Sequence, residues 1–161
     1  MENRYHPHAE SVWSYPRPPR VEPSSELVQV WLGGSRIVET RQALRVLETS
    51  HPPVYYLPLE AFAPDTLHPV SGVTHCEYKG TASYYDVVSG SSRAARGAWT
   101  YPHPAPGYEA LAATAALYPG LMDSVLVDGE EVQPQEGDFY GGWITSRVTG
   151  PFKGAPGTWG W

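Results

Sequence analysis

Lysine occurs twice in this chain, both times in the same local context. Nine of the eleven basic residues are arginine, whereas Lys79 and Lys153 each follow an aromatic ring and precede a glycine, in Tyr78–Gly80 and Phe152–Gly154. A lysine ammonium is a compact charge on a flexible stem, and a following glycine lets another backbone or a ligand approach closely. Two such groups could hold a phosphate or carboxylate together. The alternative is that both lysines lie on the surface or form structural ion pairs with glutamates.

Aromatic residues supply candidate walls for such a pocket. The chain has eleven Tyr and six Trp but only three Phe. Tyr and Trp combine a large apolar face with a polar group, which suits a binding cavity as well as the core of a small β barrel. The rings expected to line a cavity with Lys79 and Lys153 are Tyr55, Tyr78, Tyr84, Trp99, Tyr101 and Trp143.

A carboxylate and a histidine occur close together at Glu48 and His51. This pair is the minimum for general acid–base catalysis, so these two are the candidate catalytic residues, although such pairs also occur at element ends without function. The six histidines are scattered and the chain has one cysteine, Cys76, so we predict no metal site and no internal disulfide. Glycine-rich phosphate loops, dinucleotide fingerprints and nucleophile elbows do not occur in the sequence, and no cofactor is predicted.

Strands dominate the elements that must position these residues. Hairpins are expected at 27–39, around Gly33-Gly34, and at 124–132, around Asp128-Gly129, because such pairs favour two-residue turns. Other strands are expected at 54–57, within 73–88 and at 98–101, with a short helical piece at 58–67.

Two short helices are expected among these strands. Thr40 is a suitable N-cap for an apolar stripe formed by Ala43, Leu44, Val46 and Leu47, and residues 108–117 have a helical composition. The predicted fold class is therefore mainly β, an α+β arrangement with two short helices.

The length indicates one compact domain. A chain of 161 residues suits a single core, and we expect a flexible N-terminal segment at 1–10 and a domain at 11–161. Residues 141–161 are rich in glycine but carry aromatic rings, so they should pack on the body of the domain rather than form a linker.

Charge and hydropathy exclude two classes of partner. The net charge is −6 and no basic stripe is present, so nucleic acid is not expected as a partner. No apolar stretch approaches the roughly 20 residues that span a bilayer, and the first residues have no signal-peptide pattern. We therefore expect no membrane role and a cytoplasmic location.

Several longer motifs resemble those of a known bacterial family. They are Pro16–Val21, Ala43–Tyr56, Tyr78–Tyr84, Asp128-Gly129, Gly141–Thr145 and Gly150–Gly154. Together they make the chain, from Glu10 to its end, similar to the family described as domain of unknown function 427 (DUF427), which is also catalogued as nucleotidyltransferase-like. The family often has Cys-Pro-Tyr-Lys-Gly where this chain has Cys76-Glu77-Tyr78-Lys79-Gly80.

This resemblance implies a compact antiparallel β-tent or barrel-like domain. Relatives in the β-tent class often bind zinc through cysteines that this chain lacks, which implies a metal-free version with a central cavity or tunnel. The catalogue label suggests nucleotide transfer, but we find no pair of carboxylates in the sequence arranged to bind two metal ions.

These observations favour a domain that binds a small organic, in particular anionic, ligand in an aromatic cavity. The first alternative is an enzyme, nucleotidyltransferase-like or a hydrolase, that uses Glu48 and His51 as acid and base. The second alternative is a scaffold or oligomerisation unit, such as a homodimer, that associates through its tryptophan-rich C-terminus. The first interpretation requires the two aromatic–lysine–glycine segments to meet at one enclosed space.

Overall fold

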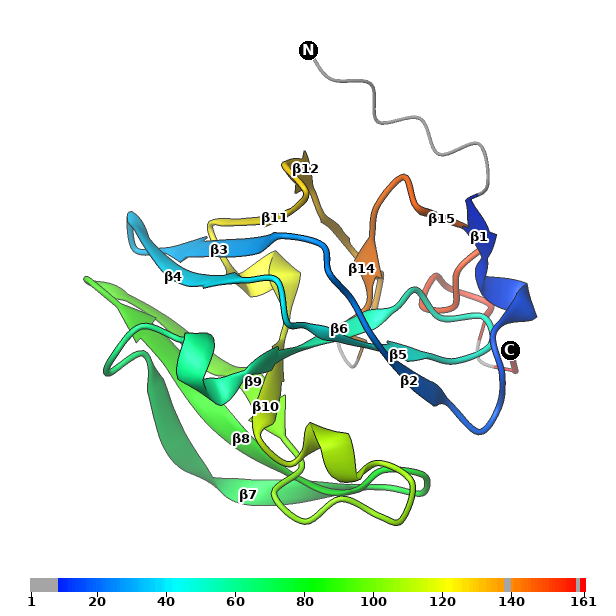
Figure 1. Cartoon of the computed structure of the whole chain (residues 1–161), viewed down its shortest axis with the longest axis horizontal. Helices are drawn as coiled ribbons and strands as arrows, with labels where there is room; N and C mark the ends of the chain where they lie inside the picture. The colour runs from blue at the N-terminus through cyan, green and yellow to red at the C-terminus, as the bar shows by residue number, and fades with distance from the viewer. Residues whose placement is uncertain (1–8, 138–139, 159) are drawn as a thin grey trace.

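The computed structural model describes residues 9–137, 140–158 and 160–161, and these fold mainly into antiparallel strands (Figure 1). The larger sheet has seven strands in the order β2-β5-β6-β10-β9-β8-β7. Their bounds are β2 Arg20–Pro23, β5 Leu44–Leu47, β6 Val54–Pro58, β7 Leu67–Cys76, β8 Gly80–Ser89, β9 Ser92–Thr100 and β10 Thr114–Leu117. The mainly β prediction is thus confirmed, and the sheet stays open at β2 and β7 instead of closing into a barrel.

The two predicted hairpins are confirmed and lie side by side in a second, four-stranded sheet. Its order is β12-β11-β3-β4, with β3 at Val28–Leu32, β4 at Ser35–Thr40, β11 at Ser124–Val127 and β12 at Glu130–Glu131. Both residues of each turn have positive φ, 62° and 80° at Gly33 and Gly34 and 48° and 81° at Asp128 and Gly129. Such angles match the twist of the flanking strands, which is why these dipeptides specify tight hairpins.

The main core fills the space between the two sheets. Alternate residues of β3 and β11, such as Val30 and Val125, pack against Tyr55, Leu57 and Leu117 of the larger sheet. Because side chains alternate across a strand, the neighbours Tyr56 and Ala116 point to the opposite face, where they join a second cluster with Trp99 and Tyr101. The central strands of the larger sheet are therefore buried on both faces.

Both predicted helices are wrong, and this double burial is the reason. Residues 44–47 form β5 and 114–117 form β10, while 109–111 make only one 3-10 turn. A strand that is buried on both faces consists of consecutive apolar residues. Where large rings of neighbouring strands occupy the space beside it, small residues such as alanine fit best. Such a run resembles a short buried helix in sequence. In the described residues, helical structure is limited to the 3-10 turns η1 Val12–Ser14, η2 Leu59–Ala61, η3 Glu109–Leu111 and η4 Pro119–Leu121.

Two short strand pairs attach the ends of the chain. Strand β1 (Glu10–Ser11) pairs in parallel with β15 (Val148–Thr149), and β13 (Gln133–Pro134) pairs with β14 (Trp143–Ile144). In the described part of the C-terminal segment, Trp143 is fully buried and the Lys153 amide donates to the Ser50 carbonyl. Glu10 belongs to the folded part, whereas the rest of the expected flexible segment, apart from Ala9, lies outside the described residues. No helix of the described chain is long and apolar enough to cross a membrane.

Candidate functional site

The second face of the seven-stranded sheet carries a row of aromatic side chains. Tyr84 of β8 is paired with Trp99 of β9, Trp99 with Ala116 of β10, and Ala116 with Tyr56 of β6. The rings of Trp99 and Tyr56 meet edge to face at 6.3 Å, and the Trp99 indole N–H donates to the Tyr56 hydroxyl at 3.2 Å.

This row forms the floor of a cavity of about 230 Å³, which we call the aromatic cavity. Its walls come from the turn after β5, the turn after β7 and the segment before β14. The lining residues are Val46, Glu48, His51, Pro52, Val54, Tyr56, Thr74, Lys79, Tyr84, Trp99, Tyr101, Tyr118, Gln135, Tyr140 and Gly141. The structure therefore brings together Glu48, His51, Lys79, Tyr84, Trp99 and Tyr101 from the residues predicted by sequence.

Lys79 reaches this cavity from the tight turn between β7 and β8. The turn is held by its backbone, since the Lys79 amide donates to the Cys76 thiol sulfur and its carbonyl accepts from the Ala105 amide. Gly80 has a φ of +111°, which disfavours any other residue, and a Cβ there would make a tight contact of 3.3 Å with the His103 carbonyl oxygen. The glycine of the aromatic–lysine–glycine pattern thus permits a close approach of backbone, as its residue type predicts.

The Lys79 ammonium has no counter-ion within the described part of the chain. Its nitrogen lies 5.9 Å from the centroid of the Tyr101 ring, and no carboxylate of the described residues pairs with it. Glu48 also lines the cavity, but it pairs with the Arg17 guanidinium at 3.5 Å. Consequently the cavity holds one ammonium group that no carboxylate of the described residues neutralises.

Glu48 and His51 lie at the two ends of one tight turn, in which the His51 amide donates to the Glu48 carbonyl. The His51 ring stacks edge to face on Tyr140 at 5.8 Å, and its Nδ1 donates to the Thr49 carbonyl oxygen at 3.0 Å. Burial lowers the pKa of His51, although the Thr49 carbonyl and the Glu48 carboxylate oppose this shift. The ring is then neutral near pH 7, and its Nε2, which carries no proton in this tautomer, can accept one.

The buried hydroxyls of the cavity remain protonated at neutral pH. Burial raises the pKa of Tyr56, and burial together with the neighbouring Tyr56 raises the pKa of Tyr101. A space lined by an ammonium group and neutral hydroxyls suits an organic anion. In the described residues, no three His, Cys, Asp or Glu side chains lie together as metal ligands.

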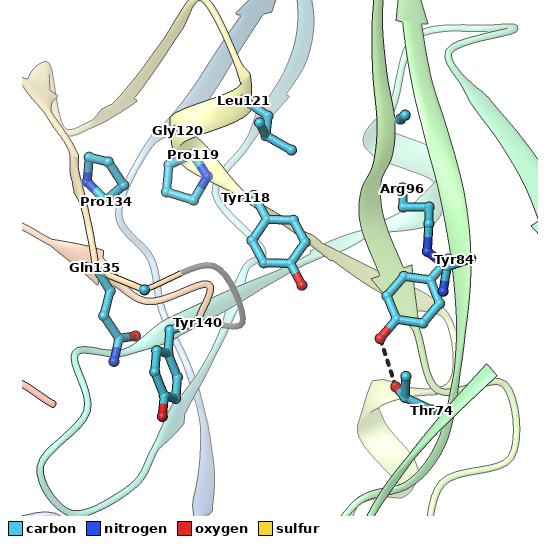
Figure 2. A pocket seen from close by; sticks show the side chains of 12 residues that line it. Thr74, Tyr84, Arg96, Tyr118, Pro119, Gly120, Leu121, Pro134, Gln135 and Tyr140 are labelled. Carbon is cyan, nitrogen blue, oxygen red and sulfur yellow. Dashed lines mark hydrogen bonds between the residues drawn. The ribbon is translucent and has the colours of Figure 1, made fainter. Parts of the chain in front are cut away.

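A larger groove continues from this cavity. We call it the arginine groove; its volume is about 510 Å³, and it shares Thr74, Tyr84, Tyr118, Gln135 and Tyr140 with the aromatic cavity. Figure 2 shows Tyr84, Arg96 and Thr74 on one wall, Pro134, Gln135 and Tyr140 on the other, and Tyr118 extending between them. The Tyr84 hydroxyl and the Thr74 hydroxyl are joined by a hydrogen bond of 2.6 Å (Figure 2).

Four of the predicted residues lie elsewhere. Tyr55 and Trp143 stack on each other at 4.6 Å in the main core, on the opposite face of the sheet from the cavity. Tyr78 packs at the edge of the second cluster but does not line the cavity. Lys153 does not line the cavity; its ammonium nitrogen lies 6.0 Å from the centroid of the Tyr140 ring and donates to the Trp161 carbonyl oxygen at 3.3 Å. The two lysines therefore do not face one common space.

Sequence reasoning missed several lining residues, namely Tyr56, Thr74, Arg96, Tyr118, Gln135 and Tyr140. Tyr56 could have been predicted as an alternative to Tyr55, because neighbouring residues of a strand point to opposite faces. The sequence did not indicate which of the two faces carries the cavity. Nothing in the sequence alone indicates that Gln135 and Tyr140 fold over the sheet.

A comparison with protein-family models bears directly on this site. Residues 20–128 match the model of a domain of unknown function, DUF427. The chain belongs to the DUF427 family. The DUF427 match includes Glu48, His51, Lys79 and Arg96, whereas Gln135, Tyr140 and Gly141, which cover the cavity, lie beyond it. No curated protein matches the chain.

Proposed function

We propose that this DUF427 protein binds a small organic anion with a flat ring in the aromatic cavity. The observation that carries the proposal is the Lys79 ammonium group beside the Tyr101 ring, with which no described carboxylate pairs, in a cavity that Trp99 and Tyr84 also line. The acid group of the ligand would pair with Lys79 and its ring would lie against the aromatic floor. We further propose that the partner is a small molecule of the cytoplasm.

The two lysines allow a matched test. Calorimetric titrations would use benzoate, naphthalene-2-carboxylate, indole-3-carboxylate and phenyl phosphate, with the carboxamides of the three acids as neutral controls. A charge-assisted hydrogen bond is worth about 1.5–3 kcal/mol, so Lys79→Met should weaken binding of the anion about tenfold or more. The amides should bind the variant and the wild type equally well.

Lys153→Met is the control, because Lys153 has the same sequence context but does not line the cavity. It should leave the affinity for the anions unchanged. Equal losses in the two variants, or a wild type that binds none of the acids, would contradict the proposal.

Ester hydrolysis in the same cavity is a second candidate function. The favouring observation is that His51 lines the cavity with Nδ1–H held by Thr49, which leaves Nε2 as the proton acceptor. In this reaction His51 takes a proton from water as the water oxygen attacks the ester, and the alcohol leaves with that proton.

The pKa of His51 predicts the pH dependence of such a reaction. With 4-nitrophenyl phosphate or 4-nitrophenyl acetate, the rate should be constant near pH 7 and should fall only below pH 6.5, the ordinary pKa of histidine, because burial lowers the pKa of His51. His51→Gln should abolish turnover, whereas His75→Gln, at an exposed position outside the cavity, should not. Turnover that survives His51→Gln would rule out this role.

A further inference from the structure

We infer that the ligand carries two acid groups, one on each side of a flat ring, and that Arg96 binds the second of them. This inference rests on the proposed binding at Lys79 and extends it along the arginine groove. It assigns a dianion with an aromatic middle as the chemical class of ligand.

Among the residues that the structure describes, no carboxylate pairs with the side chain of Arg96. Of the eight arginines that the structure describes, six pair with Asp or Glu, and only Arg41 and Arg96 do not. Asp86 lies beside Arg96, but its carboxylate pairs with the Arg93 guanidinium and accepts only the backbone N–H of Arg96, at 2.8 Å. Arg96 therefore places on the wall of the groove a cation that no carboxylate of the described residues neutralises.

The guanidinium of Arg96 is held in place before any ligand arrives. Its central carbon lies 4.2 Å from the centroid of the Tyr84 ring, and Nη1 donates to the Ser71 carbonyl oxygen at 3.0 Å. A Cβ on Gly72 would lie 3.1 Å from Nη1, so the glycine leaves room for the guanidinium. Stacking on a ring and one fixed hydrogen bond reduce the entropy lost on binding, and the guanidinium keeps other N–H donors for an anion.

The backbone also directs Arg96 toward the groove. Strand β9 is bulged here, because its pairing with β8 shifts register between Tyr85 and Val87, and Arg96 has a φ of +51°. A bulge changes the direction in which a side chain leaves the strand. Positive φ is unfavourable for a residue with a branched or long side chain, so this conformation is maintained by the Asp86 contact and the ring stacking around it.

The two cations belong to one continuous cleft. Tyr84 lines both the aromatic cavity, where Lys79 lies, and the arginine groove, where Arg96 stacks on its ring. Tyr118 reaches from the opposite wall into the same space (Figure 2). A flat ring that contacts Tyr84 and Tyr118 would lie where the cavity that holds Lys79 meets the groove that holds Arg96. The described residues that line the groove include no carboxylate that would repel the second acid group.

The test compares ligands that differ by one acid group. The probes are terephthalate, naphthalene-2,6-dicarboxylate and biphenyl-4,4′-dicarboxylate, each with the monoacid of the same ring, so that three separations of the acid groups are covered. Wild-type protein should bind at least one diacid about tenfold more tightly than its monoacid, the effect of one additional charge-assisted contact. This preference should decrease as the salt concentration is raised.

Three variants assign the preference to Arg96. Arg96→Gln should remove the preference for the diacid while the affinity for the monoacid stays at the wild-type value. Arg96→Lys should restore part of the preference, because it keeps the charge but not the planar donors. Arg41→Gln is the matched control, since Arg41 also has no carboxylate partner but bonds to the Ser25 carbonyl, away from the cleft. Thermal melting of each variant checks that it is folded.

The outcomes separate this inference from the proposed function. If Lys79→Met weakens binding of the monoacids but Arg96→Gln leaves the diacid preference intact, Arg96 is not the second anion site and only this inference fails. If no probe binds the wild type, or if Lys79→Met has no effect, the proposed function fails and this inference fails with it.

Discussion

Gly141 lines the aromatic cavity beside Trp99, and its lack of a side chain leaves room for the indole ring. Gly141 lies against the outer edge of Trp99, and a Cβ at this position would be 2.3 Å from the ring carbon Cη2. The position of the Trp99 ring therefore depends on a missing side chain on the segment that covers it.

Gly141→Ala should displace the Trp99 ring and reduce ligand binding. Its φ is not positive, so the effect is steric, and overpacking of this kind costs about 1–3 kcal/mol of unfolding free energy. Denaturant unfolding and near-ultraviolet circular dichroism would measure the loss of stability and the changed environment of tryptophan. Gly120→Ala is the control, because a Cβ there would meet Pro134 at an ordinary 3.5 Å. Equal stability of the two variants would show that Trp99 is free to move.

At this scale the sequence indicated which residue types line the site but not every position. Lys79, Glu48, His51 and three of the expected rings could be identified from type and spacing, and all of them line one cavity. Tyr55 was expected there, but strand alternation places Tyr56 in the cavity and Tyr55 in the core. The sequence did not identify Arg96 as a site residue, because its role depends on a β-bulge that no local sequence pattern predicts.

At the scale of elements, the hairpins and the buried strand β6 were predictable, whereas the buried strands β5 and β10 were not. Gly33-Gly34 and Asp128-Gly129 specify their turns through backbone angles that few other residues adopt, so local chemistry is sufficient. Strands β5 and β10 have no such marker. Their pattern becomes clear only when partners cover both faces, and without that knowledge an alanine- and leucine-rich run resembles a helix.

The short strand β1 is held by a charged cluster. Arg45, which is fully buried, bonds to Glu10 at 2.8 Å and to Glu22 at 2.7 Å, and the Tyr15 hydroxyl donates to Glu10 at 2.6 Å. Arg147 also pairs with Glu10, at 3.2 Å, which joins β1 to the C-terminal segment. Although burial opposes it, hydrogen bonds from Arg45 and Tyr15 lower the pKa of Glu10 to about 2.

This shift predicts a loss of stability in acid. A carboxyl group whose pKa is lower in the folded state stabilises the fold fully above its ordinary pKa of 4.5, and this contribution is lost as the pH falls from 4.5 toward 2. Urea unfolding between pH 6 and pH 2.5 should show the decline, and Glu10→Gln should make the curve flatter as well as lowering stability at neutral pH. Glu39→Gln, which removes an exposed pair with Arg36, is the control and should change stability at neutral pH by about 1 kcal/mol or less. Parallel curves for wild type and Glu10→Gln would contradict this account.

At the scale of the whole molecule, the site is assembled where the C-terminal part of the chain covers the larger sheet. Buried Gln135 accepts from the Gly142 amide and donates to the Lys153 carbonyl, which ties together the segments on both sides of Tyr140. Trp143 fills the main core beneath them, and β15 pairs with β1 at the same end of the molecule (Figure 1). Thus the matched part of the chain supplies the floor and cations of the cleft, while residues beyond 128 supply its cover.

The sequence by itself determined that the chain is mainly β, where its hairpins turn, and that Lys79 and a set of rings were the residues to examine. These properties depend on local chemistry, because turn angles, strand alternation and the charge of a side chain belong to residues and their immediate neighbours. Only the tertiary structure decided which face of the large sheet carries the cavity, which of the two lysines enters it and that Arg96 lies along the same cleft. Those relations arise from contacts between segments far apart in the chain, such as Trp99 with Gly141, which no local pattern specifies.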